Sequence, residues 1–131
     1  MEPKSYGVNL LNEERERSIP EPSNSIDASY IGRVSKVVEL LHGKWTVQIL
    51  CAMRTRPVRL SELKRVIPQA SKKALTASLR SLEAARVVIR RDLSGSLLHV
   101  EYELADAMRE PLVTLLDHLA EWGKLRDSEE R

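Results

Sequence analysis

The sequence predicts an α+β fold that is mostly helical, and three observations support this. Apolar residues recur at three- and four-residue spacing through most of residues 30–123. Only residues 87–89, which are β-branched, and residues 99–104, which alternate, show the patterns typical of strands. The chain has 131 residues, of which 42% are hydrophobic, enough for one domain with its own core.

Two helices are expected first. Ser29 is the candidate N-cap of the first helix, and Gly43 is its candidate stop. A second helix is expected over residues 44–54, and Pro57 breaks the chain after it. The apolar faces of the two helices consist of Ile31, Val34, Val37, Val38 and Leu41 in the first, and Trp45, Ile49, Leu50 and Met53 in the second.

The next two helices are joined by a tight turn. Residues 59–60 allow only a minimal strand, and Ser61 is the candidate cap of a short helix over 62–67. Ser71 is the candidate N-cap of a longer helix over 72–84. The inward apolar residues of this pair are expected to be Leu63, Val66 and Ile67, then Leu75, Leu79 and Leu82.

A hairpin and a long helix complete the domain. The turn-rich residues 92–96 lie between the two strand patterns. The last helix is expected over 107–123, with Gly123 as its stop. Two short helices joined by a tight turn and followed by a hairpin describe a winged helix-turn-helix, in which the second helix of the pair enters the major groove of DNA.

The remaining segments lie outside this domain. Residues 1–29 favour a flexible N-terminal arm, and the alternative is that Val8, Leu10 and Leu11 pack on a partner subunit. Residues 125–131 form a charged C-terminal tail. No apolar run approaches the roughly 18 residues of a membrane span, and no secretory leader is evident, so we expect a cytoplasmic protein with no membrane partner.

The net charge of +2 is the sum of segments that carry opposite net charges. Residues 54–91 contain eleven Lys or Arg and two Glu, a net charge of +9. Residues 1–53 sum to −1 and residues 92–131 to −6. A basic segment between acidic flanks predicts one surface for a polyanion, and double-stranded DNA is the expected partner.

The 72–84 helix carries the sharpest candidates for DNA contact. Lys73, Thr76 and Arg80 lie opposite its leucines, and Arg80 is suited to a bidentate contact with guanine. Neighbouring strand residues point to opposite faces, so only one of Arg90 and Arg91 is expected to face DNA. The full predicted set is Ser71, Lys72, Lys73, Thr76, Ala77, Arg80, Arg59, Lys64, Arg90, Arg91, Ser94, Gly95, Ser96 and His99, with Arg54 and Arg56 as further phosphate contacts.

The first and last helices have apolar stripes that predict a homodimer. A two-fold dimer would place two recognition helices about one DNA turn, or a multiple of it, apart. The alternative is that both helices only close the monomer core. The predicted interface residues are Ile31, Val34, Val38, Leu112, Leu115, Leu116, Leu119 and Trp122.

The sequence gives little support for catalysis, metal binding or a reactive thiol. His42, His99 and His118 lack metal-ligand spacing, and no nucleotide or nucleophile motif occurs, so neither an enzyme nor a cofactor is expected. Cys51 is predicted to be a partly buried filler, with a redox thiol beside Arg54 as the alternative. Two further alternatives stay open: a protein-interaction module for an acidic partner, and a small-molecule effector. Trp45 and Trp122 are expected to pack, or otherwise to line an effector site.

Two segments carry a family resemblance: residues 40–50, with Gly43-Lys44-Trp45 at the entry to the second helix, and residues 100–104 in the second strand of the hairpin. Together they resemble the corresponding segments of the HxlR-type bacterial transcription regulators, within the MarR-like superfamily. The similarity covers about residues 30–124. It implies a dimeric winged helix-turn-helix domain that binds promoter DNA and usually needs no cofactor.

The chain also departs from the family pattern. Arg86 stands where a glycine normally follows the recognition helix, which predicts a different turn. Residues 94–98 replace a proline-rich wing tip, and Leu60 replaces a phenylalanine. Gly32 stands near the position of a cysteine that some members carry, so the resemblance implies no redox sensing there.

Overall fold

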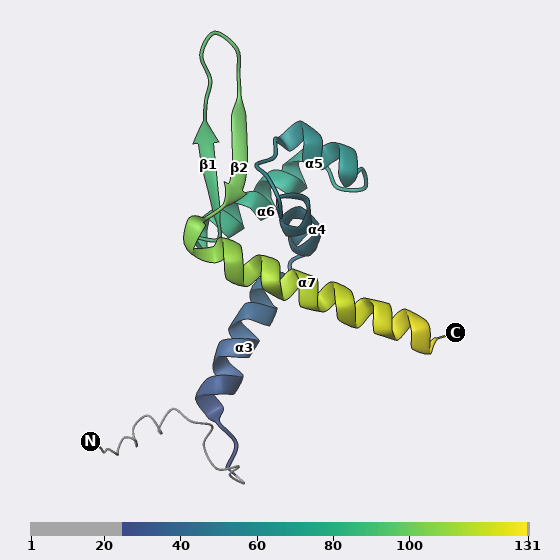
Figure 1. The fold of residues 1–131 in the computed structure, drawn as a ribbon. Coiled ribbons are helices and arrows are strands. Elements are labelled where there is room, and N and C mark those ends of the chain that lie inside the picture. Colours follow the sequence, from purple (N-terminus) through teal and green to yellow (C-terminus); the bar gives the residue numbers. More distant parts are fainter. Residues whose placement is uncertain (1–24, 131) are drawn as a thin grey trace, which may run out of the picture. The chain divides into compact units, whose positions relative to one another are not determined.

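Five helices and a two-stranded antiparallel sheet make up residues 25–130, the part of the chain that the computed structural model describes (Figure 1). The fold is mostly helical with a small hairpin, as the sequence predicts. The chain divides into two units between Ser35 and Lys36, and every buried residue of the described chain lies in the second. The elements are α3 (Ala28–Leu41), α4 (Thr46–Ala52), α5 (Leu60–Val66), α6 (Lys72–Ala84), β1 (Val88–Asp92), β2 (Val100–Leu104) and α7 (Asp106–Glu129).

The first helix begins two residues earlier than expected. The Asp27 carboxylate accepts hydrogen bonds from the backbone N–H groups of Ser29 and Tyr30, at 3.0 and 3.1 Å. The cap prediction at Ser29 is wrong because the carboxylate of Asp27 fills that role, and the Ser29 hydroxyl donates to it as well. The bond from Tyr30 is the main cause that lowers the pKa of Asp27. Val8, Leu10 and Leu11 lie outside the described residues.

The α4–α5 region forms one side of the core. Ile49, Leu50 and Met53 are fully buried as predicted, and so is Leu63. Helix α5 begins after Arg59, whose backbone N–H donates to the Glu62 carboxylate at 2.9 Å, so the predicted cap at Ser61 is wrong.

The inward face of α5 also differs from the prediction. Val66 is exposed rather than buried. Leu60, Leu63 and Ile67 define the inward face of this short helix, and Val66 lies about 90° away from its centre on standard helix geometry.

Helix α6 matches the predicted recognition helix in both bounds and cap. The Ser71 hydroxyl accepts a hydrogen bond from the Ala74 backbone N–H at 3.0 Å. Leu75, Leu79 and Leu82 are buried and attach the helix to the core.

The turn after α6 corrects the expectation about Arg86. Arg86 has φ 64°, the left-handed conformation that glycine favours. Its N–H donates to the Glu83 carbonyl, and the Val87 N–H donates to the Leu82 carbonyl, both at 2.9 Å. These two bonds define a Schellman motif. The arginine therefore adopts the turn that a glycine would make, rather than a different one.

The hairpin pairs β1 with β2 in antiparallel register, with Arg90 opposite Tyr102. Val58 adds a single bridge to this sheet, exchanging two 2.8 Å backbone hydrogen bonds with Tyr102. The minimal strand expected at residues 59–60 is therefore reduced to a single bridge, which lies at Val58, one residue earlier in the chain. It fastens the wing to the segment that leads into α5.

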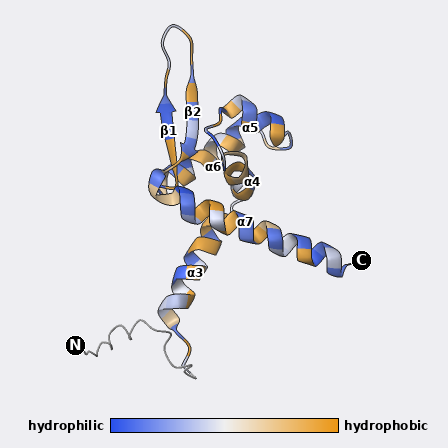
Figure 2. Cartoon of the chain, in the orientation of Figure 1, coloured by the Kyte–Doolittle hydropathy of each residue, from blue (hydrophilic) through white to orange (hydrophobic). Residues whose placement is uncertain are grey.

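Helix α7 continues through Gly123 to Glu129, so the predicted stop is wrong. A glycine in a helix interior costs only about 1 kcal/mol, and no left-handed turn forms here. Ion pairs one turn apart, Lys124 with Glu121 at 3.5 Å and Arg126 with Glu130 at 3.2 Å, support the last turns. Hydrophobic residues are interspersed with hydrophilic ones along α7 as a whole (Figure 2).

Candidate nucleic-acid interface

The outward face of α6 is a narrow stripe of two cations and two small residues. Lys73, Ala77, Arg80 and Ala84 are exposed and recur at four- and three-residue spacing, opposite the buried leucines. Thr76 is half-buried at the edge of this stripe. Within residues 25–130 no carboxylate lies within ion-pair distance of Lys73 or Arg80. The stripe thus presents two unpaired long cations on a helix whose small residues permit close approach to a surface.

A groove of about 300 Å³ opens beside the first turn of α6. It is lined by Arg59, Leu60, Ser61, Lys72, Arg90, Leu98, Val100 and Tyr102, from α5, α6 and the hairpin. Three of these residues are cations and none is an acid. The N-terminus of α6 adds its own positive potential at Lys72. This cationic groove is suited to an anionic group such as a DNA phosphate.

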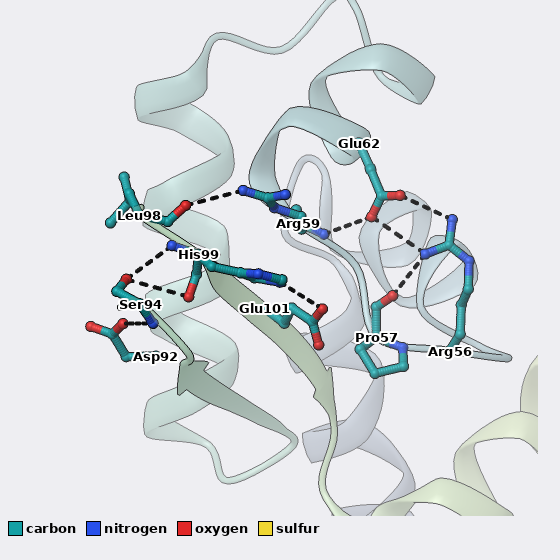
Figure 3. A network of polar contacts seen from close by, with 9 residues as sticks. All are labelled: Arg56, Pro57, Arg59, Glu62, Asp92, Ser94, Leu98, His99 and Glu101. Carbon is teal, nitrogen blue, oxygen red and sulfur yellow. Dashed lines mark hydrogen bonds and ion pairs between the residues drawn. The ribbon is translucent and has the colours of Figure 1, made fainter. Parts of the chain in front are cut away.

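Arg59 connects the two parts of the groove. Its guanidinium donates to the Leu98 carbonyl at 3.3 Å, across 39 residues of sequence (Figure 3). Glu62 holds the same segment from the other side, accepting from the Arg59 backbone and from the Arg56 guanidinium at 3.2 Å. The bond from the Arg59 backbone is the main cause that lowers the pKa of Glu62, and the Arg56 bond adds to it.

The wing loop is organised by its own side chains. The Ser94 backbone N–H donates to Asp92 and the His99 N–H donates to the Ser94 hydroxyl, each at 2.9 Å (Figure 3). Hydrogen bonds from Ser94, its side chain first, lower the pKa of Asp92. Ser94 therefore has an internal role, while Gly95 and Ser96 are exposed at the tip.

The two arginines of β1 separate as strand alternation predicts. Arg90 lines the cationic groove, whereas Arg91 forms an ion pair with Glu103, which raises the pKa of Arg91. On the Arg91 side, His99 contacts Glu101 at 2.9 Å and Arg109 lies 3.8 Å from Glu103. Arg91 and His99 thus each have an acidic neighbour on this side of the hairpin, and their role in DNA contact stays a prediction.

Three other predicted phosphate contacts are also engaged within the protein. The Lys64 ammonium donates to the Pro68 carbonyl at 2.9 Å and to the Ala70 carbonyl at 2.8 Å, which ties α5 to the turn before α6. Arg54 lies 3.6 Å from Asp117 and Arg56 pairs with Glu62. Only Asp117, the partner of Arg54, comes from a distant segment, whereas the partners of Lys64 and Arg56 lie four to six residues away in the sequence.

The predicted dimer residues fall into three groups by exposure. Exposed residues are Ile31, Val34, Val38, Leu119 and Trp122, with Trp122 at 65%. Leu112 and Leu115 are half-buried, and Leu116 is buried at 5% in the core. Within residues 36–130, Val38, Leu119 and Trp122 are exposed and do not belong to the core. An apolar groove of about 230 Å³ is lined by Val37, Leu40, Leu41, Leu50, Val87, Met108, Pro111, Leu112 and Leu115.

The predictions for Cys51 and for the two tryptophans have different outcomes. Cys51 is exposed rather than a partly buried filler. Trp122 is exposed, while Trp45 packs on the core as expected, with the Lys44 ammonium 5.3 Å from its ring centroid. The redox hypothesis for Cys51 stays a prediction.

Sequence reasoning missed the leucines of the wing. Leu93, Leu97 and Leu98 are all exposed around the hairpin loop. The available signal was three leucines in a turn-rich segment. Among residues 25–130 no helix is long and apolar enough to span a bilayer, and no group of three metal-ligating side chains occurs.

A helix pair with an exposed cationic second helix, followed by a hairpin beside its N-terminus, defines a winged helix-turn-helix protein of the DNA-binding class. The HxlR-like helix-turn-helix family matches residues 40–130. The chain belongs to this family of transcriptional regulators.

Relatives agree with this assignment. The chain is 41% identical over 90 residues to the HTH-type transcriptional regulator YtcD of Bacillus subtilis, covering 69% of this chain and 71% of YtcD. It is 33% identical over 102 residues to an HTH-type transcriptional regulator of Methanothermobacter thermautotrophicus, covering 78% and 77% of the two chains. A crystal structure of YtcD superimposes with a TM-score of 0.66 at 38% identity, covering 72% of this chain and 96% of that one.

Proposed function

We propose that the protein is a cytoplasmic homodimer that regulates transcription by binding specific sequences of double-stranded DNA. The observation that carries this proposal is the exposed α6 stripe, where Lys73 and Arg80 have no acidic partner within residues 25–130. Arg80 reads a guanine through a bidentate contact, and Thr76 touches a neighbouring base edge. Ala77 and Ala84 let the helix backbone approach the floor of the major groove.

Phosphate contacts position the recognition helix. Lys72 and Arg90 line the cationic groove and face the same open space as Arg59. Each phosphate that they neutralise is expected to steepen the log–log salt dependence of binding by about 0.9. We leave Lys64 and Arg91 out of this contact set, because the Lys64 ammonium donates to two carbonyls and Arg91 forms an ion pair with Glu103, whereas Arg59 makes one hydrogen bond to Leu98 and still lines the open groove.

The exposed apolar residues support the homodimer. Val38 in α3, and Leu119 and Trp122 in α7, expose large side chains that a second copy would cover. A two-fold pairing would place two α6 helices on successive turns of one face of DNA, so we expect two half-sites separated by about 10 base pairs or a multiple.

Selection from a pool of random duplexes tests the function directly. We expect recovery of a sequence with two half-sites, and we expect Arg80→Ala to lose discrimination at a guanine, worth about 1–3 kcal/mol. Lys72→Ala should instead weaken binding to all duplexes alike and reduce the salt slope. Arg126→Ala is the matched control, because Arg126 pairs with Glu130 at the end of α7.

Two results would contradict the proposal. If no duplex binds even at low salt, the basic face meets an acidic protein partner instead of DNA. If Arg80→Ala and Lys72→Ala weaken binding to every duplex equally, Arg80 contacts only a phosphate.

A further inference from the structure

The tip of the wing exposes more apolar surface than a hydrophilic loop would. Leu97 and Leu98 are 80% and 79% exposed, and Leu93 at the other side of the loop is 53% exposed. Scattered single leucines on a surface are ordinary, but three exposed leucines in one short loop are an unusual concentration of apolar surface and indicate an interaction site. No side chain of residues 25–130 covers them.

The loop holds these leucines in a defined place. The Leu93 N–H donates to the His99 carbonyl at 2.7 Å, and the Gly95 N–H donates to the Leu97 carbonyl at 3.2 Å. The Leu98 carbonyl accepts from the Arg59 guanidinium, which connects the tip to the start of α5 (Figure 3). The leucine side chains are therefore presented by a braced loop.

The surroundings of Leu98 identify the kind of partner. Leu98 itself lines the cationic groove, together with Arg59, Lys72 and Arg90, and no acid lines that groove. An apolar tip beside three cations fits a partner that is polyanionic outside and apolar within. Duplex DNA has this combination, with phosphates along its edges and stacked bases between them.

We propose that Leu97 and Leu98 insert as an apolar wedge into the minor groove next to the major groove that α6 reads. The wedge partly unstacks one base step and bends the duplex, while Arg59 acts as a positioning residue for the tip. Minor-groove proteins that insert leucines in this way kink DNA by roughly 20–90°. The inference rests on the proposed function and adds a second point of recognition, a deformable base step.

The test compares two double variants of nearly equal side-chain volume. Leu97→Met with Leu98→Met keeps the tip apolar, and Leu97→Gln with Leu98→Gln makes it polar. Both positions are exposed, so both variants should keep the thermal stability of the unmodified protein. The probe is the duplex recovered by selection, about 30 base pairs long to include both half-sites.

Two readouts report the wedge. Energy transfer between dyes at the duplex ends measures the bend, and 2-aminopurine, placed in turn at each adenine, reports unstacking. We expect the unmodified protein and the methionine variant to bend the duplex by at least about 20°. We also expect both to increase the fluorescence of 2-aminopurine at one position, which marks the unstacked base step. The glutamine variant should do neither, and its affinity should fall roughly tenfold while base preference at the α6 contacts stays.

Other outcomes overturn the wedge. A glutamine variant that bends and unstacks DNA like the unmodified protein shows that the leucines do not enter the duplex. A glutamine variant with unchanged bending but an altered mass in sedimentation without DNA shows that the leucines cover a second copy instead. Failure of the unmodified protein to bind any duplex refutes the proposed function itself, a result distinct from binding without bending.

Discussion

Replacing Arg86 by glycine should raise the stability of the domain. Arg86 holds φ 64° in the Schellman motif that ends α6 and turns the chain into β1. A residue with a Cβ atom in this left-handed region is disfavoured by roughly 1–2 kcal/mol, and glycine is not. Within residues 25–130 the Arg86 side chain has no hydrogen bond or ion pair that the change would remove.

The expected gain is small because the unfolded chain also changes. Glycine makes the unfolded state more flexible, which offsets roughly 0.4–1 kcal/mol. The net increase in the free energy of unfolding is therefore about 0.5–1 kcal/mol. For a domain of this size, that corresponds to a rise in Tm of about 2–4 °C.

Differential scanning calorimetry at one fixed protein concentration measures this shift, because the Tm of a dimer depends on concentration. Arg86→Ala is the control: it removes the same charge but keeps a Cβ atom in the left-handed region. We expect the free energy of unfolding of Arg86→Gly to exceed that of Arg86→Ala by about 0.5–1 kcal/mol. A glycine variant no more stable than the alanine variant would refute the argument. Any change in DNA affinity common to both variants comes from the lost charge.

Three further predictions concern other elements. Lys64→Met should lower the free energy of unfolding by about 1–3 kcal/mol, because two carbonyls lose their charged donor, while the salt slope of DNA binding measured by titration stays unchanged. Folding lowers the pKa of Glu62, so the Glu62 carboxylate stabilises the folded state fully at pH values above its ordinary pKa of 4.5. This stabilisation is lost as the pH falls through the lowered pKa of the folded state. The difference in Tm between the unmodified protein and Glu62→Gln should therefore disappear at such acidic pH. Trp122→Ala should shift sedimentation toward monomer with little loss of monomer stability, whereas Leu116→Ala should cost about 2–5 kcal/mol in denaturant unfolding.

Local patterns in the sequence predicted most of the elements. Helix α6 and its cap at Ser71 follow from three leucines at helical spacing and a serine before them, both of which act within a few residues. Errors occurred where two local signals competed. Asp27 replaced Ser29 as the first cap, and Gly123 permitted a helix that it was expected to end.

The candidate site was predicted less completely, because partners come from distant segments. The sequence indicated that residues 54–91 are basic, but it did not indicate which of their cations are free of partners within the protein and so can contact DNA. The fold pairs Arg91 with Glu103 and connects Arg59 to Leu98, and it leaves Lys73 and Arg80 without acidic partners among residues 25–130.

The sequence by itself determined the type and order of the elements, because periodicity and capping are properties of neighbouring residues. It also determined that a basic segment coincides with the helix-turn-helix. Only the tertiary structure decided which charges are neutralised, which leucines are buried and which lie exposed at the wing tip. Ion pairs and burial depend on residues brought together across tens of positions, and a one-dimensional pattern does not specify that approach.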